Sequence, residues 1–319
     1  MKKHTITLLT LIIAALTLIT HVSSQEGAKV RLKMASGFSG GTYDKMATAL
    51  SAIPGLEVSN RTTTGSEENL QLVKQKLADV AFVQTDAYKS AKLKDRNLRS
   101  KVKMLFPVFS EELHLIVNKK VKTLDRLKGA KVSIGALNSG TAVTSKIVLQ
   151  ILNVKYPATS AASLQNMSTA DALKKVQTGE IAAMFLVSGS PVAKLKGLNA
   201  SVKSNIRLYS FDVTETDLLT DNYFYYKNAI IPSSDYPWVN SDVKTVAVET
   251  LIVVRNDLDD DQVRFLINGI YGNQLELSEK HVKWKDVDFR QVVKFKARTK
   301  MVDYHPAVYG AVDELAKKL

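Results

Sequence analysis

Apolar and polar positions along the chain follow two patterns in turn, one typical of strands and one typical of helices. Residues 30–35 alternate apolar and polar side chains, as a half-buried strand does, and the run 80–83 is wholly apolar, as in a buried parallel strand. Residues 43–53 and 64–77 instead place apolar side chains every three or four positions, which predicts helices. This alternation predicts an α/β fold in which helices cover both faces of parallel sheets.

The same order of elements returns about one hundred residues further along the chain. In this second copy a strand is expected at 131–136, a helix at 142–152, a second helix at 169–178 and a buried strand at 181–187. An internal repeat of this kind predicts two lobes of similar build. Ligands of such sheets bind at the carboxyl ends of the strands, and a cleft between two domains is a preferred site for a small molecule.

The first 24 residues have the composition of an export signal. Lys2 and Lys3 precede an apolar run at 6–19, and a stretch of mostly small residues follows at 21–24. A membrane-spanning helix needs ~20 apolar residues, so we expect residues 1–24 to be a cleaved signal peptide rather than an anchor. A lipid anchor requires a Cys, and the chain has none. These features predict a soluble protein of the periplasm.

Composition and charge narrow the functional classes. The 319 residues suffice for two ordinary domains, and the absence of Cys excludes disulfide scaffolds, Cys-ligated zinc, iron–sulfur clusters and a thiol nucleophile. The net charge of +13 falls to +11 when Lys2 and Lys3 leave with the signal. The basic clusters at 89–103, 119–131 and 283–300 contain no nucleic-acid-binding module. We interpret them as solvated faces that attract anions at long range, and we expect no nucleic-acid partner.

Two polar turns are the candidate binding elements. Ser39-Gly40-Gly41-Thr42 lies between the first strand and helix, and Asn138-Ser139-Gly140-Thr141 has the same place in the second copy. Glycines let the backbone approach a ligand, and hydroxyls together with free helix N–H groups bind an anion without a charged side chain. Gln84 and Ser188 end the two buried strands at the same level. Taken singly, each turn is better explained as an ordinary helix cap, and its recurrence at the same place in both copies makes the binding interpretation equally consistent. Gln84 and Ser188 fit either the wall of the cleft or loop residues facing water.

Signals for catalysis, metals and nucleotides are weak. Beyond the signal, the His residues are His114, His281 and His305, and neither a His-Glu-x-x-His motif nor a Gly-x-Ser-x-Gly turn is present. His114 lies in an apolar run and is interpreted as structural. The acidic run 259–261 is better explained as the start of a helix at 262–271, because carboxylates suit the positive end of a helix dipole. We therefore assign no catalytic residue, no metal ligand and no cofactor.

Short motifs spread over nearly the whole mature chain form an ordered set. They are a Gly-Gly-Thr-Tyr turn at 40–43, Thr-Gly-Ser-x-Glu-Asn-Leu at 64–70, Ala-Asp-x-Ala-Phe-Val-Gln at 78–84, Leu-x-x-Leu-Lys-Gly at 124–129, the turn at 138–141, Ile-Pro-x-x-x-Tyr-Pro at 231–237, a strand and helix start at 245–258, and the tail at 302–309. This set resembles the TAXI family of TRAP-transporter solute receptors. The chain departs from the family at Asn138, where the usual residue is Gly.

The resemblance implies a type II periplasmic-binding-protein fold, which is an α/β fold with two lobes and a ligand cleft between them. Lobe 1 is then expected at 25–112 plus 240–319 and lobe 2 at 113–239. The family captures a small organic anion, such as glutamate, 2-oxoglutarate or a related carboxylate, and delivers it to TRAP transporter membrane subunits. Carried over by position, the ligand-binding residues are Ser39, Gly40, Gly41, Thr42, Tyr43, Gln84, Asn138, Ser139, Gly140, Thr141 and Ser188.

Other interpretations stay open on the sequence alone. The same two-lobed fold hosts some transferases, so an enzyme is one alternative, although no nucleophile or general base stands out among the motifs. A protein that binds surfaces or polyanions through its Lys clusters is another. Tyr223, Tyr225 and Tyr226 fit either an aromatic wall of the cleft or a strand packed in a core. The leading expectation is a monomeric solute receptor that is not an enzyme.

Overall fold

The computed structural model describes residues 29–157, 162–290, 292 and 304–317. The predicted signal peptide, residues 1–24, lies outside the described residues. Within the described ranges, none of the helices combines the length and the apolar composition that crossing a bilayer requires.

The first copy of the repeat forms a parallel three-stranded unit. Strands β1 (Val30–Ala35), β2 (Leu56–Arg61) and β3 (Val80–Gln84) lie in the order β2-β1-β3. Helix α2 (Thr42–Ala49) connects β1 to β2, and α3 (Ser66–Lys74) connects β2 to β3. These bounds agree with the elements predicted from the apolar periodicity.

The second copy repeats this topology. Strands β5 (Lys131–Ser133), β6 (Ser163–Gln165) and β7 (Ala183–Ser188) are parallel and lie in the order β6-β5-β7. Helices α6 (Gly140–Leu152) and α7 (Thr169–Thr178) connect them as α2 and α3 connect the strands of the first copy. The predicted internal repeat is therefore confirmed in the fold.

Two long strands join the copies into one continuous sheet. They are β4 (Val102–Asn118) and β10 (Val243–Arg255), and the order along the sheet is β2-β1-β3-β10-β4-β7-β5-β6. Strand β10 pairs antiparallel with β3 and β4, and β4 pairs antiparallel with β7. The sheets are thus mixed, whereas the sequence pattern predicted parallel sheets. The difference arises because β4 and β10 carry the chain from one copy to the other, and so run against the strands that they join.

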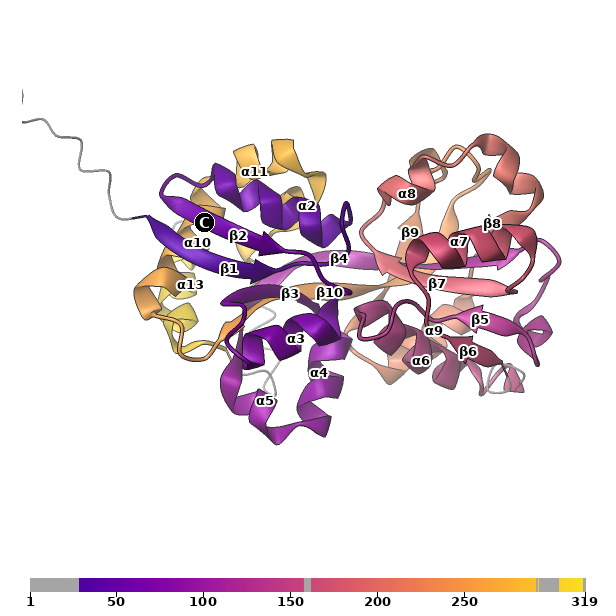
Figure 1. The fold of residues 1–319 in the computed structure, drawn as a ribbon, viewed down its shortest axis with the longest axis horizontal. Helices are drawn as coiled ribbons and strands as arrows, with labels where there is room; N and C mark the ends of the chain where they lie inside the picture. The colour runs from indigo at the N-terminus through magenta and orange to yellow at the C-terminus, as the bar shows by residue number, and fades with distance from the viewer. Residues whose placement is uncertain (1–28, 158–161, 291, 293–303, 318–319) are drawn as a thin grey trace, which may run out of the picture.

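Strands β8 (Ile206–Leu208) and β9 (Tyr226–Ile231) extend the sheet by pairing antiparallel with β4 and β10. The remaining α-helices cover this sheet (Figure 1). They are α4 (Thr85–Lys94), α5 (Arg96–Lys101), α8 (Ala193–Lys196), α9 (Val213–Asn222), α10 (Asp260–Gly272), α11 (Gln274–Lys280) and α13 (Pro306–Ala316). Helices α10, α11 and α13 return to pack against the first copy (Figure 1). Asp259 caps α10 by accepting hydrogen bonds from the backbone N–H groups of Asp261 and Gln262, so the acidic run starts a helix, as predicted.

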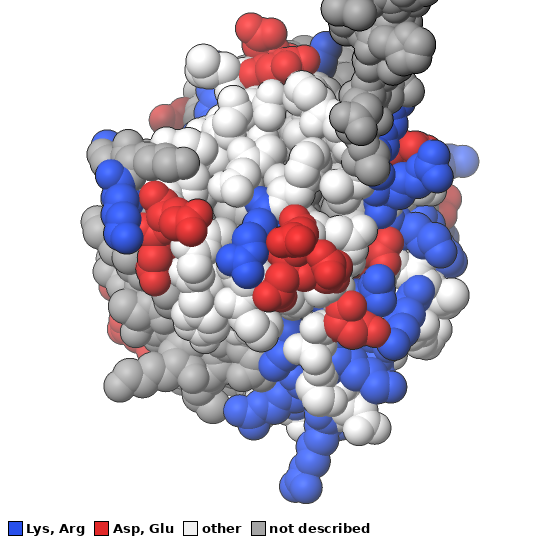
Figure 2. Space-filling view, turned by 90° about the vertical axis from the view of Figure 1, so that its left-hand side faces the viewer, with Lys and Arg blue, Asp and Glu red and all other residues white. Residues whose placement is uncertain are grey.

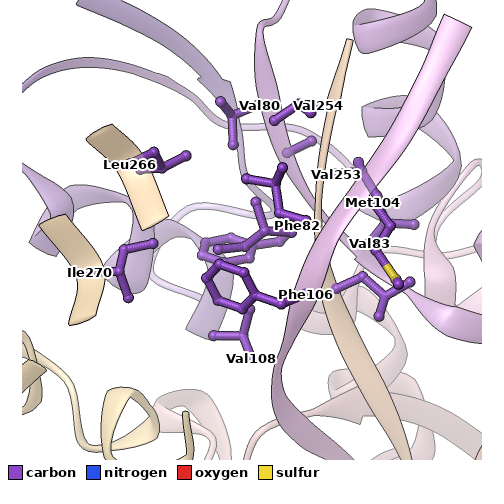
Figure 3. Close-up of a cluster of buried hydrophobic side chains, with 14 of the residues drawn as sticks. Val80, Phe82, Val83, Met104, Phe106, Val108, Val253, Val254, Leu266 and Ile270 are labelled. Atoms are coloured by element: carbon purple, nitrogen blue, oxygen red, sulfur yellow. The ribbon is translucent and has the colours of Figure 1, made fainter. Parts of the chain in front are cut away.

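Each copy packs around a hydrophobic core of its own, and we keep the names lobe 1 for the elements around β1–β3 and lobe 2 for those around β5–β7. In lobe 1, Phe82 and Phe106 belong to one buried cluster with Leu266 and Ile270 (Figure 3). In lobe 2, the core includes Tyr225 and Tyr226, both largely buried. Those Tyr residues therefore pack in a core rather than line a cleft. The residues at which the lobes divide, placed at 112 and 240 from the resemblance, stay a prediction.

Candidate functional site

A small cavity lies between the lobes, at the carboxyl ends of β3 and β7. Its volume is about 40 Å³. It is lined by Gly37, Phe38, Gly41, Thr42, Tyr43, Thr64, Gly65, Ser66, Gln84, Glu111, Ser139, Gly140, Thr141, Val187 and Ser188. Because one water occupies about 30 Å³ in the liquid, such a cavity has room for very few solvent molecules. The two lobes therefore lie closed against each other.

Lobe 1 contributes the N-terminal end of α2. Gly41 is the N-cap residue and brings no side chain to satisfy the first helical N–H groups. A Cβ at Gly41 would lie 2.8 Å from the Phe38 ring, so a side chain there would force the turn to shift. The next residue, Thr42, reaches across the cavity, with its hydroxyl 3.3 Å from that of Ser188 on lobe 2.

Lobe 2 contributes the N-terminal end of α6 to the opposite wall. Ser139 caps this helix by accepting a hydrogen bond from the Ala142 N–H at 3.1 Å. The Thr141 hydroxyl accepts one from the Val187 N–H, also at 3.1 Å, and thereby fixes the helix end to β7. The two helix ends with their positive dipoles face one cavity, which is an arrangement suited to an anion.

Gln84 and Gly140 lie close together where the lobes meet. Gln84 is buried at the end of β3, where its backbone N–H donates to the Ser66 hydroxyl at 3.1 Å. The Thr144 hydroxyl on α6 lies 3.4 Å from the Gln84 side-chain oxygen. A Cβ at Gly140 would collide with that same oxygen and lie 2.5 Å from the Ser66 hydroxyl. A side chain at position 140 would therefore require Gln84 and Ser66 of the opposite lobe to shift.

The structure brings eight of the eleven predicted site residues together around the cavity: Gly41, Thr42, Tyr43, Gln84, Ser139, Gly140, Thr141 and Ser188. Ser39, Gly40 and Asn138 are exposed outside the lining. The Gly40 N–H is already used, because it donates to the Asp44 carboxylate at 2.8 Å. Asn138 has a φ of 62°, a left-handed conformation that Gly adopts freely and Asn tolerates. Asn in place of Gly here is thus compatible with the backbone of the turn.

Glu111 is the lining residue with an ionisable carboxyl group, and the sequence motifs did not indicate it. It lies on β4 and is 3% exposed. Its Oε2 accepts hydrogen bonds from the Tyr43 hydroxyl at 2.6 Å and from the Thr250 hydroxyl at 2.9 Å. Burial raises the pKa of Glu111 to about 7, although these hydrogen bonds oppose the rise. The available signal was a pair of acidic residues, Glu111 and Glu112, inside an apolar strand.

Further polar contacts bridge the lobes beside the cavity. Asp86 of lobe 1 is fully buried and accepts hydrogen bonds from two hydroxyls of lobe 2, from Thr144 at 2.6 Å and from Tyr226 at 2.8 Å. Burial raises the pKa of the Asp86 carboxyl. Glu112 accepts from the Ser190 N–H of lobe 2 at 2.7 Å and also pairs with Lys283 of lobe 1 at 3.1 Å. The contacts with Thr144, Tyr226 and Ser190 join the two lobes.

The His residues act in structural roles. His114 is buried, its Nε2 lies 2.8 Å from the Tyr236 hydroxyl, and burial lowers its pKa to about 4, so the ring is neutral. This agrees with its predicted role. His281 and His305 each cap the helical turn that follows them. In the part of the chain that the structure describes, no cluster of His, Asp and Glu is arranged to hold a metal ion.

Basic side chains gather on the outer surface of lobe 1 rather than at the cavity. Figure 2 shows Lys and Arg side chains gathered toward the bottom of the lobe 1 end, where α5 lies in Figure 1. Helix α5 carries the exposed residues Arg96, Arg99 and Lys101. None of the residues that line the cavity is a Lys or an Arg.

The comparisons with known proteins agree with this geometry. The model of the NMT1-like family matches residues 34–311. The chain belongs to the NMT1-like family. Among solved structures, a protein from Bordetella bronchiseptica RB50 is 14% identical, with 91% of this chain and 99% of that chain covered and a TM-score of 0.51. An ancestral arginine-binding protein bound to arginine is 13% identical, with 81% and 99% covered and a TM-score of 0.50. This NMT1-like protein therefore has the predicted two-lobed fold of periplasmic binding proteins.

Proposed function

We propose that this NMT1-like protein is an extracytoplasmic solute receptor that captures a small organic anion between its lobes. The observation that carries the proposal is the cavity itself, because both lobes build it and the N-terminal ends of α2 and α6 face each other across it. Two helix ends and several hydroxyls can bind a carboxylate without a basic side chain. The eleven residues predicted from the sequence remain our proposed ligand-binding set, with the eight that line the cavity as its centre.

Ligand capture would proceed by hinge closure. In an open form the cavity would be accessible to solvent. The described arrangement, with a cavity of about 40 Å³, would be the fully closed form without ligand, and the lobes would close less far around a ligand of amino-acid size, with interlobe contacts such as that of Asp86 joining them. The long strands β4 and β10 connect the lobes, so bending along them would separate the two helix ends. We place the division of the lobes at residues 112 and 240.

The finer parts of the proposal come from the ordered motifs. They support a TAXI-type receptor that acts in the periplasm as a monomer, takes glutamate, 2-oxoglutarate or a related carboxylate, and delivers it to TRAP transporter membrane subunits. The ancestral arginine-binding protein has arginine bound, and an amino acid is a ligand of the size that this architecture accepts. No catalytic role is proposed.

Calorimetric titration of the mature chain with dicarboxylates, 2-oxo acids and amino acids tests this function. We expect saturable one-site binding, lost or weakened at least tenfold in Thr141→Ala and Gln84→Ala, since each removes a polar group at the cavity. Thr178→Ala and Gln71→Ala are matched controls, because both residues are exposed on helices away from the cavity. Unchanged binding in both cavity variants would overturn the site, and no binding by any compound would overturn the function.

A further inference from the structure

Among the described residues that line the cavity, Glu111 alone carries an ionisable carboxyl group. The other polar groups of the lining are hydroxyls, one amide and the N-terminal ends of three helices, α2, α3 and α6. Both hydrogen bonds that Glu111 receives from Tyr43 and Thr250 go to the same oxygen, Oε2. The Gln84 side chain also hydrogen-bonds to Glu111. Because a carboxylate offers about four lone-pair sites, these three partners leave Glu111 capacity for one more donor. The cavity therefore has an anion-binding end and a strong acceptor.

This pairing disfavours a ligand that is only anionic. A ligand carboxylate next to an ionised Glu111 would place two like charges in a buried site, and like charges in low dielectric repel strongly. A ligand that carries a carboxylate and an ammonium group on the same carbon fits both features. Its carboxylate would lie at the helix ends, and its ammonium group would donate to Glu111.

We propose, on the basis of the function proposed above, that Glu111 contacts the ligand's ammonium group and makes the receptor select α-amino acids over 2-oxo acids of the same carbon skeleton. Glu111 is then a specificity-determining residue of the cavity. Tyr43 and Thr250, which bind its Oε2, hold the carboxylate in position from α2 and β10.

The charges around Glu111 define how binding should depend on pH. The groups that face it are the Tyr43 hydroxyl from α2, Glu112 on its own strand, and, beyond Glu112, Lys283 from the turn η6 (Val282–Asp286). Lys283 is paired with Glu112 at 3.1 Å, so its charge is already partly compensated. From β3 and β10 only the uncharged Gln84 and Thr250 reach Glu111. Since the pKa of Glu111 is about 7, an ammonium ligand should expel its proton, whereas a purely anionic ligand should make Glu111 take one up.

The test is calorimetry on the full mature chain with matched pairs of ligands. The pairs are L-glutamate with 2-oxoglutarate, L-alanine with pyruvate, and L-leucine with 4-methyl-2-oxopentanoate, titrated in two buffers of different ionisation enthalpy. For the pair that binds best, we expect the amino acid to bind at least about tenfold more tightly than the 2-oxo acid. Its binding should release about half a proton at pH 7, and its affinity should rise about 30-fold from pH 5.5 to pH 8.

Two variants refine the test. Glu111→Gln keeps the size of the side chain, and we expect it to lose both the preference for the amino acid and the dependence on pH. Glu276→Gln is the matched control, since Glu276 is exposed on α11. The proton count and the pH profile of the unaltered protein need no variant, so the inference stays falsifiable even if Glu111→Gln fails to fold.

The outcomes separate this inference from the function on which it rests. Equal or tighter binding of the 2-oxo acid, proton uptake with the amino acid, or an unchanged preference in Glu111→Gln would each overturn the role of Glu111 and leave the receptor function standing. No binding by any member of the three pairs would overturn the proposed function, and the inference with it.

Discussion

Lobe 1 and lobe 2 share one strand order, β2-β1-β3 and β6-β5-β7, yet they bring different chemistry to the surface where they meet. Lobe 1 supplies carboxylate acceptors, among them the buried carboxyl group of Asp86. Lobe 2 supplies the hydroxyl groups of Thr144 and Tyr226, which donate hydrogen bonds to the Asp86 carboxyl group. The comparison shows that the repeat gives both lobes the same backbone topology. The different side chains at a few positions make the lobe 1 surface and the lobe 2 surface complementary where they meet.

The glycines of the two helix ends differ in the same way. Gly41 in lobe 1 is constrained by its own turn, through the ring of Phe38. Gly140 in lobe 2 is constrained by the opposite lobe, through Gln84 and Ser66. A side chain at position 140 should therefore hinder closure without harming either core.

The largest effect is expected for Gly140→Ala. The added methyl group would meet Gln84 and Ser66 of lobe 1, so both side chains must shift before the lobes can close, and ligand affinity should fall by about 100-fold. Gly272→Ala is the control, since a methyl group there meets nothing within 4 Å. Calorimetry and small-angle X-ray scattering would measure affinity and closure. Ligand binding at the affinity of the unaltered protein would show that the contact between the lobes is not needed.

The next effect concerns the free energy of unfolding and its dependence on pH. It tests Glu111, the buried acid that lobe 1 contributes to the cavity and that has no counterpart in the lobe 2 lining. The folded-state pKa of Glu111, about 7, lies above the ordinary value of 4.5, so the folded protein binds the proton more tightly than the unfolded chain. Its stabilising contribution is complete below pH 4.5 and is lost as the pH rises through 7. Between pH 5 and pH 8, we expect the free energy of unfolding to fall by about 2 kcal/mol more than in Glu111→Gln.

Denaturant titrations of both proteins at the two pH values would measure this difference. An equal change in the free energy of unfolding in both proteins would mean that the pKa of Glu111 is the same in the folded and unfolded states. The pKa and the pH dependence inferred for ligand binding would then both be wrong.

A smaller effect is expected for Asp86→Ala, which removes the acceptor that joins the lobes. Thr144 and Tyr226 would lose their partner in the closed form but would be hydrated in the open form, so closure should weaken and affinity should fall about tenfold. Asp217→Ala, at an exposed position of α9, is the control. Calorimetry gives the affinity, and an unchanged value would assign closure to the other contacts between the lobes.

The smallest effect is expected on the outer face of lobe 1. Replacing Arg96, Arg99 and Lys101 of α5 with Gln should change affinity less than about twofold, because surface charges act mainly on association rates. The association rate at low salt, measured by stopped flow, should fall. A large loss of affinity, or steeply salt-dependent binding of heparin to the unaltered protein, would favour the polyanion-binding alternative.

Much of the fold could be predicted because local patterns encode it. The periodicity of residues 43–53 and 142–152 indicated α2 and α6, and the apolar runs ending at Gln84 and Ser188 indicated β3 and β7. Parallel strands in one sheet end at the same edge, so the residues at their ends meet without any knowledge of long-range contacts.

The remainder depends on pairing between distant segments. No local pattern indicates that β4 and β10 run antiparallel to their neighbours, since the partner strands lie far away in the chain. The role of Glu111 cannot be predicted from local sequence for the same reason, because the groups that hydrogen-bond to it, Tyr43 and Thr250, come from distant elements. Asn138 belongs to the predicted ligand-binding set because of its position in a motif, whereas the structure places it on the solvent-exposed side of the turn.

A crystal structure of the mature protein grown with the best-binding amino acid would test the central claim most directly. The account predicts a ligand between the lobes, with its carboxylate at the N-terminal ends of α2 and α6 and in contact with Thr141, and its ammonium group at Glu111. A ligand bound on an outer face, or a carboxylate directed at Glu111 with no contact to either helix end, would contradict it.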